Sequence, residues 1–196
     1  MAHIIRSCSL VNADGQAVVW AGRVLGHPLP ERVTGMDLML ALWDRAARER
    51  YRVFLLGAEP AVVRQVAAIA TRRGVDVVGH RDGHWSWDQE PEVVAAVREA
   101  RPDLLFLAVP TPRKEYFLAR HLADLNCGLA VDVGGSFDVV AGLRARAPRW
   151  MRGAGLEWAF RLRQEPRRLS ARYLVGNTAF VLLVIGEALA RRNPRR

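Results

Sequence analysis

Short apolar runs alternate with amphipathic segments along the first two-thirds of the chain. Four such runs lack the polar alternation of a half-exposed strand, and each ends at or just before glycine or proline: 52–57, 75–79, 103–109 and 129–133. Segments with apolar residues at helical spacing flank these runs: 35–50, 60–73, 91–101 and 114–125. Continuous apolar strands separated by amphipathic helices are typical of a parallel sheet that helices cover on both faces.

The pattern therefore predicts an α/β fold, a Rossmann-like and mostly parallel sheet with helices on both faces. It predicts two domains, a core over 1–150 and a basic, partly apolar helical appendage over 151–196. In sheets of this kind ligands collect at the carboxyl ends of the strands. Here those ends carry 57–59, 79–81, 110–112 and 134–136, and these short segments are the first candidates for a site.

The start of the chain allows two interpretations. Two short apolar pieces, 9–12 and 18–20, lie on either side of Asp14-Gly15, and they place Asp14 at the junction of a strand and a turn. A carboxylate held there can serve as a general base toward a sugar hydroxyl. Asp-Gly is also a common turn sequence that needs no chemistry, and from spacing alone the ordinary turn is favoured.

The charge is concentrated in the last quarter of the chain. The net charge is +9, and residues 144–196 hold 13 arginines against three glutamates, a balance of +10. Nucleic acid, an anionic membrane and a phosphorylated substrate all fit such a block. Residues 155–172 predict a basic helix, and 173–190 are mostly apolar. The polar interruptions and flanking arginines favour a packed or interfacial helix over a transmembrane one.

Several expected signals are missing from the sequence. Two cysteines without a CxxC spacing, Cys8 and Cys127, imply neither a zinc site nor a disulfide framework. The first ten residues are too short and too polar for a signal peptide. No dinucleotide-binding glycine motif, no P-loop and no metal-ligand spacing of histidine or aspartate occurs, so the sequence predicts no cofactor and no metal.

Three further positions stand out, each with a structural alternative. Thr34 fits an N-cap, with Asp37 in the capping-box position, and capping is the favoured interpretation. Arg32, just before that helix, can pair with a phosphate or can have a structural role. Lys114 is the single lysine of the chain, which mildly favours a specific role for its ammonium group. The aromatic loop 82–88 fits either stacking on a sugar or base, or a surface turn with partly buried tryptophans.

An ordered series of motifs carries a resemblance to a known family. The motifs are Ala13-Asp-Gly15, Arg23-Val-Leu-Gly26, Glu31-Arg-Val-Thr-Gly35, Phe54-Leu-Leu-Gly57, Pro112-Arg-Lys-Glu115, Val133-Gly-Gly-Ser-Phe-Asp138, Arg146-Ala-Pro-Arg-Trp150, Gly155-Leu-Glu-Trp158 and Gln164-Glu-Pro-Arg-Arg168. From about residue 9 to 175 the chain resembles the WecG/TagA/CpsF glycosyltransferases.

The resemblance implies an inverting, metal-independent transferase. Such enzymes move an N-acetylhexosamine-type sugar, often N-acetylmannosamine, from UDP to a polyprenyl-diphosphate-linked sugar at the inner, cytoplasmic face of a bacterial membrane. The product is a precursor of a cell-surface polysaccharide. The resemblance also implies attachment of the appendage to an anionic membrane, an oligomer in the unattached state, and no nucleic-acid partner.

The same resemblance assigns roles to individual residues. Asp14 matches the proposed general base of the family. The residues expected to bind substrate are Arg32, Thr34, Lys114, Glu115, Gly134, Gly135, Ser136, Asp138, Arg161, Arg168 and Arg172. Arginines of the appendage are expected to close over the nucleotide diphosphate.

Two departures from the family pattern set the rival hypotheses. Family members usually begin with a segment about fifty residues before the aspartate, whereas only 13 residues precede Asp14 here. We therefore expect that one wall of the pocket is lacking from this chain. Lys114 stands where many members have glutamine, so the donor sugar is left open. The alternatives are an inactive, truncated remnant of the transferase and a basic nucleic-acid-binding module.

Overall fold

The structure of the protein is a computed structural model that describes residues 2–192, apart from the side chains of residues 2, 168, 169, 171, 172 and 192. The chain folds into two compact units. The sheet unit comprises Met1–Val11 and Thr34–Ala145, and the arginine unit comprises Asn12–Val33 and Arg146–Arg196. The segment around Asp14 therefore groups with the C-terminal helices. The predicted domains, 1–150 and 151–196 with their separate roles, stay a prediction.

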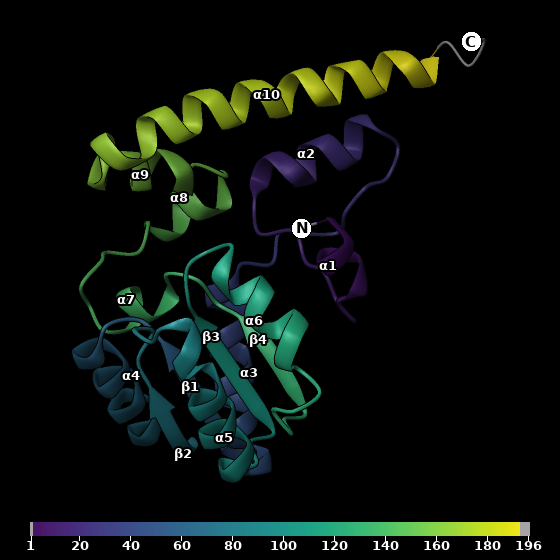
Figure 1. Cartoon of the computed structure of the whole chain (residues 1–196). Coiled ribbons are helices and arrows are strands. Elements are labelled where there is room, and N and C mark those ends of the chain that lie inside the picture. Colours follow the sequence, from purple (N-terminus) through teal and green to yellow (C-terminus); the bar gives the residue numbers. More distant parts are fainter. Residues whose placement is uncertain (1, 193–196) are drawn as a thin grey trace. The chain divides into compact units, whose positions relative to one another are not determined.

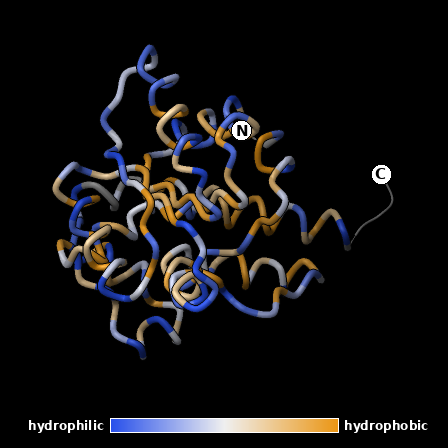
Figure 2. Tube along the Cα trace, turned by 90° about the horizontal axis from the view of Figure 1, so that it is seen from below, coloured by the Kyte–Doolittle hydropathy of each residue, from blue (hydrophilic) through white to orange (hydrophobic). Residues whose placement is uncertain are grey.

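Four parallel strands form the centre of the sheet unit, in the order β2-β1-β3-β4. Their bounds are β1 Arg52–Gly57, β2 Asp76–Arg81, β3 Leu104–Ala108 and β4 Leu129–Asp132. The register of β1 on β3 is regular from Val53 opposite Leu104 to Gly57 opposite Ala108. Since all four strands run the same way, their carboxyl ends meet at one edge, as predicted. Figure 2 shows the hydropathy of each residue along the Cα trace, with hydrophobic and hydrophilic stretches in alternation.

Helices cover both faces of this sheet (Figure 1). The helices of the sheet unit are α1 Ala2–Ser7, α3 Gly35–Glu49, α4 Pro60–Arg72, α5 Glu90–Ala100, α6 Arg113–His121 and α7 Ser136–Val140, with a 3₁₀ turn η1 at Trp87–Gln89. The predicted α/β class with a parallel sheet is confirmed. Helix α6 ends at His121, four residues earlier than predicted.

Alternate side chains of each central strand enter two separate cores. Leu55 and Phe106 pack with α3, α4 and α7 on one face of the sheet. Leu56 and Leu105 pack with α5 and α6 on the other face. Each of these four side chains is fully buried. Successive side chains of a strand point to opposite faces, so a continuous apolar run requires cover on both sides.

The arginine unit contains four helices among its described residues. They are α2 Gln16–Val24, α8 Arg149–Gly153, α9 Glu157–Gln164 and α10 Pro166–Arg192. The predicted helix over 155–172 is in fact divided, because α9 ends before Pro166 and α10 begins there. Pro166 lacks the N–H that would continue the preceding helix, and it suits a first helical turn. Helix α10 then runs unbroken through Gly176 and Gly186.

The predicted strand before Asp14 is wrong. Residues 9–14 have no regular secondary structure, and 18–20 lie in α2. The apolar run that begins at Ala17 does not alternate with polar residues, and such a short run fits a helix as well as a strand. Within α2 the side chains of Val19 and Ala21 are buried.

Candidate functional site

In the sheet unit, the carboxyl edge of the sheet is closed tightly at the end of β1. Gly57 has a φ of +124°, and a Cβ atom at this position would lie 2.4 Å from the carbonyl oxygen of Ala108. The next residue, Ala58, donates its N–H to that same oxygen at 3.0 Å. Only glycine fits here, because both the backbone angle and the close approach exclude a side chain.

Lys114 is held at the same edge by a carboxylate from the neighbouring strand. Its Nζ lies 2.6 Å from Oδ2 of Asp132 at the end of β4, and 4.0 Å from Oε1 of Glu115. Lys114 is buried and sits in the first turn of α6, where a positive charge opposes the helix dipole. The two carboxylates compensate this charge. The structure thus places the predicted residues Lys114 and Glu115 together with Asp132, which the sequence prediction did not include.

The glycine turn after β4 is fixed by the other oxygen of Asp132. Oδ1 of Asp132 accepts the N–H of Gly134 at 2.9 Å, and Gly134 has a φ of +48°. No atom lies within 4 Å of a Cβ built on Gly134 or on Gly135, so the space beside both glycines is open. One carboxylate therefore connects the ammonium group of Lys114 to a turn that a ligand can approach closely.

Ser136 and Asp138 follow this turn in the short helix α7. The hydroxyl of the buried Ser136 donates to the carbonyl of Val133 at 2.6 Å. The carboxylate of Asp138 lies 3.2 Å from Nε of Arg144. Ser136 thus satisfies a backbone carbonyl of the turn, and Asp138 pairs with the charge of Arg144. Their predicted contact with substrate stays a prediction.

Thr34 caps helix α3, as the sequence predicted. Its hydroxyl accepts the N–H of Asp37 at 3.1 Å and donates to Oδ2 of Asp37 at 2.7 Å. Thr34 is buried, and these two bonds use its one donor and one of its acceptor sites. The capping role is confirmed, whereas the substrate contact is untested.

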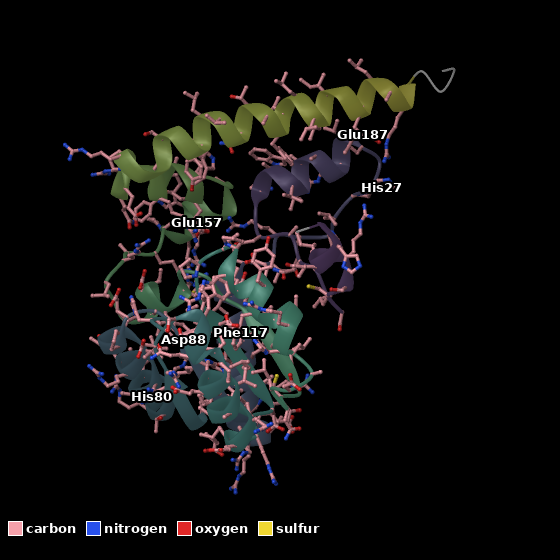
Figure 3. The ribbon with its side chains drawn as sticks, viewed as in Figure 1. His27, His80, Asp88, Phe117, Glu157 and Glu187 are labelled. Carbon is pink, nitrogen blue, oxygen red and sulfur yellow. The ribbon has the colours of Figure 1, made fainter. Side chains whose placement is uncertain are left out.

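The aromatic loop 82–88 is a surface turn with one buried and one exposed tryptophan, and stacking on a sugar or base stays a prediction. Trp85 is buried and packs edge-on against Phe117, with ring centroids 5.8 Å apart. Trp87 is exposed, and the guanidinium groups of Arg113 and Arg120 lie 5.5 and 4.7 Å from its ring centroid. The adjacent Asp88, labelled in Figure 3, has a pKa below its usual range because the Ser86 side chain hydrogen-bonds its carboxylate.

In the arginine unit, a backbone contact brings the Asp14 segment alongside Arg32. The carbonyl of Ala13 accepts the N–H of Val33 at 3.0 Å, and Nδ2 of Asn12 donates to the carbonyl of Val33 at 2.6 Å. Asp14 follows one member of this pair and Arg32 precedes the other. The two residues predicted to act as base and as phosphate ligand therefore lie on adjoining stretches of backbone, and Asp14 is exposed.

Arg32 and Arg161 share one carboxylate, that of Glu157 (labelled in Figure 3). Nη2 of Arg32 lies 3.0 Å from Oε2 of Glu157, and Nη2 of Arg161 lies 3.1 Å from Oε1. The predicted site residues include both arginines but not Glu157, although Glu157 belongs to the family motif 155–158. The side chains of Arg168 and Arg172 lie outside the described part of the structure.

The apolar part of α10 is exposed. Its stretch Tyr173–Arg191 is long and apolar enough to cross a membrane by length and composition, and none of it is buried within the protein. One such helix is weak evidence for a span, and the predicted interfacial position stays a prediction. Beside it lies an open groove of about 610 Å³ between α9 and α10, with Trp158, Leu162 and Leu174 in its lining.

Metal ligands do not cluster in the part of the chain that is described. No group of three or more His, Cys, Asp or Glu side chains there is placed to hold an ion. Metal independence remains a prediction, because substrate phosphates can themselves supply ligands to a cation.

The sequence profile of the glycosyl transferase WecG/TagA/CpsF family matches residues 1–194. The chain belongs to this family. Among curated proteins, the N-acetylglucosaminyldiphosphoundecaprenol N-acetyl-beta-D-mannosaminyltransferase of Bacillus spizizenii strain W23 is 34% identical over 167 residues. That alignment covers 84% of this chain and 64% of the relative's length. The family resemblance found in the sequence is therefore confirmed.

Proposed function

We propose that this WecG/TagA/CpsF family member transfers an N-acetylhexosamine-type sugar from UDP to a polyprenyl-diphosphate-linked sugar. The observation that carries the proposal is the placement of Asp14 beside the Arg32 segment, in a chain whose family consists of glycosyl transferases. The name of the Bacillus relative favours N-acetylmannosamine as the sugar and a diphosphate-linked N-acetylglucosamine lipid as the acceptor.

The proposed reaction is a single displacement with inversion. The acceptor hydroxyl oxygen forms a bond with the anomeric carbon, and the bond from that carbon to the diphosphate oxygen breaks. Asp14 takes the hydroxyl proton, and UDP leaves with the bonding electrons. An exposed carboxylate that a hydroxyl can reach has the chemistry of a general base.

Arginines take the place of a metal in this proposal. The leaving diphosphate gains negative charge, and fixed guanidinium groups stabilise such charge through paired hydrogen bonds. Arg32 and Arg161 are the candidates whose side chains the structure describes, and Arg168 and Arg172 are candidates by the family resemblance alone. On the sheet unit, Gly134 and Gly135 stay predicted substrate-binding residues, and the space beside them is open.

A lipid-linked acceptor requires the enzyme to work at a membrane surface. The balance of +10 over 144–196 and the exposed apolar side chains of α10 fit a surface of anionic lipid. We therefore place the protein at the inner face of the cell membrane as a peripheral protein, with an oligomer as its unattached form.

The test is a transfer assay with a panel of radiolabelled UDP-sugars and a synthetic polyprenyl-diphosphate N-acetylglucosamine acceptor. Labelled product from at least one UDP-N-acetylhexosamine is expected. Binding of short DNA or RNA with a steep salt dependence and no binding of UDP would instead support a nucleic-acid-binding module. UDP binding without any product would indicate the inactive remnant.

A further inference from the structure

Each carboxylate oxygen of Glu157 binds one arginine, and the two arginines come from different parts of the sequence. Arg32 lies 125 residues away along the chain, and Arg161 lies one helical turn away on α9. The side chains of Arg32 and Glu157 are only 14% and 12% exposed, whereas that of Arg161 is 56% exposed. The carboxylate is thus nearly enclosed, and its two partners differ in their access to solvent.

The backbone that presents Glu157 is fixed by close packing. Gly155, two residues earlier, is buried with a φ of +73°, and a Cβ atom there would lie 2.6 Å from Cγ of Gln16. Glu157 is also the first residue of α9, where the helix dipole favours a negative charge. The backbone packing at Gly155 and the helix position thus both favour a carboxylate at this point.

A second contact within the arginine unit joins the end of α10 to the segment that follows α2. Arg191 of α10 donates to the carbonyl of Leu25 at 2.8 Å, lies 2.9 Å from Nε2 of His27, and pairs with Glu187 at 2.9 Å. Figure 3 labels Glu187 and His27 at this contact. The segment that carries Arg32 is therefore attached to the C-terminal helices at two separated points.

Charge explains why a carboxylate is needed between the two arginines. Two guanidinium groups repel each other, and a nearly enclosed one without a counter-ion is costly. Glu157 removes this repulsion and leaves the three groups with a net charge of +1. Each guanidinium has five N–H donors, so both keep donors for a further anion after binding Glu157.

We propose that Glu157 is a positioning residue, which holds Arg32 and Arg161 side by side for the diphosphate of the sugar nucleotide. Glu157 itself does not touch the substrate. The inference rests on the proposed function, since it takes UDP as the anion. It assigns the motif 155–158 a role that the sequence prediction left open.

The test compares UDP affinities of full-length variants by isothermal titration. Glu157→Gln keeps an oxygen that can accept a hydrogen bond and removes the charge, and we expect it to bind UDP on the order of tenfold more weakly, typical of a lost charged contact. Arg32→Gln should lose a similar factor. The double variant should lose little more than either single one, because residues that act as a unit are not additive.

Two controls separate positioning from general damage. Asp44→Asn removes an exposed carboxylate from Arg73 on the sheet unit, and it should leave UDP affinity unchanged. The exchange Arg32→Glu with Glu157→Arg retains an ion pair of reversed polarity, so it serves even where Glu157→Gln fails to fold. A merely structural pair predicts that this exchange restores UDP binding, whereas a positioning role predicts that binding stays weak.

The outcomes are distinct. Unchanged or tighter UDP binding in folded Glu157→Gln would overturn the inference, and tighter binding would identify Glu157 as a competitor of the diphosphate. Restored binding in the exchanged variant would overturn it as well. Absence of UDP binding in the unaltered protein would instead refute the proposed function, and the inference with it.

Discussion

The sheet unit and the arginine unit are stabilised in different ways. The sheet unit buries two apolar cores, one on each face of its strands, with large side chains such as Trp43, Phe106 and Phe117 fully enclosed. Among the described residues of the arginine unit, the buried apolar side chains are the small or medium-sized Val19, Ala21 and Ala147. Its specific contacts are mainly ion pairs and hydrogen bonds to backbone.

The different burial of apolar side chains indicates which unit has a surface suited to a binding partner. Apolar burial is the main driving force for folding, and the two cores supply it to the sheet unit. The arginine unit leaves many large apolar side chains in solvent, including Trp20, Trp158 and Leu183. Exposed apolar patches beside excess positive charge are typical of surfaces that bind another partner, and here we propose an anionic membrane. The five predictions below test this contrast.

The largest effect is expected from Asp14→Asn in the arginine unit. Removing the proposed base should lower the transfer rate roughly 10²–10⁴-fold. UDP affinity and thermal stability should change little, because Asp14 is exposed and the substitution keeps its size. Steady-state kinetics beside isothermal titration check both parts. Retained turnover would exclude Asp14 as the base.

A truncation of the sheet core should reduce stability strongly. Phe106→Ala removes a fully buried ring and should cost about 3–5 kcal/mol of unfolding free energy. The change Trp20→Ala in the arginine unit removes a ring that is 49% exposed and should cost less, about 1–2 kcal/mol. Urea denaturation measures both. Equal losses would contradict the contrast between the units.

Removal of residues after 172 should strongly weaken membrane binding without unfolding the sheet unit. The deletion removes the exposed apolar stretch of α10 together with Arg191. Sedimentation with vesicles of phosphatidylglycerol and phosphatidylethanolamine should show at least about a tenfold loss, since apolar insertion and charge both contribute. Vesicle binding equal to that of the full chain would refute attachment through α10.

A smaller loss is expected from Asp132→Asn at the carboxyl edge of the sheet. Lys114 would lose its nearest counter-ion, and the Gly134 turn would lose a charged acceptor. We expect about 1–2 kcal/mol of unfolding free energy, because Asp132 is itself half exposed. The control Asp44→Asn should cost less than about 0.5 kcal/mol. Thermal or urea unfolding of both variants tests the difference.

The smallest effect concerns the two thiols. Burial raises the pKa of Cys127, whereas Cys8 is exposed. A thiol of raised pKa forms less thiolate, so iodoacetamide should label Cys8 first and Cys127 later near neutral pH. Mass spectrometry of the labelled peptides gives the order.

The same thiol makes stability depend on pH. Because the folded state keeps its Cys127 proton to higher pH than the unfolded chain, the free energy of unfolding should fall as pH rises above the usual thiol range.

The sequence predicted the sheet unit better than the arginine unit, for a physical reason. Continuous apolar runs such as 104–108 can be satisfied only between two layers of helices, so the pattern indicates both the strands and their cover. The run around Val19 is short and without alternation, so its pattern fits a strand as well as the helix α2 in which it lies. The local hydrophobic pattern alone does not decide whether such a segment forms a strand or a helix.

The candidate site was predictable only in part. The cap at Thr34 depends on residues three apart, and the sequence shows it directly. The pair of Arg32 with Glu157 joins residues 125 positions apart, and no spacing in the sequence indicates it. The same holds for Lys114 and Asp132, which meet because two strands of the sheet are neighbours. Contacts of this kind depend on tertiary structure.

The most direct measurement is transfer of radiolabelled N-acetylmannosamine from UDP to the synthetic lipid acceptor in the presence of EDTA, with the full chain on anionic vesicles. The account predicts a labelled disaccharide lipid of inverted anomeric configuration, at a rate that EDTA does not reduce. Full loss of product in EDTA that Mg²⁺ restores would contradict the arginine-based mechanism. Absence of product in every condition, from protein that binds the vesicles and UDP, would contradict the proposed function itself.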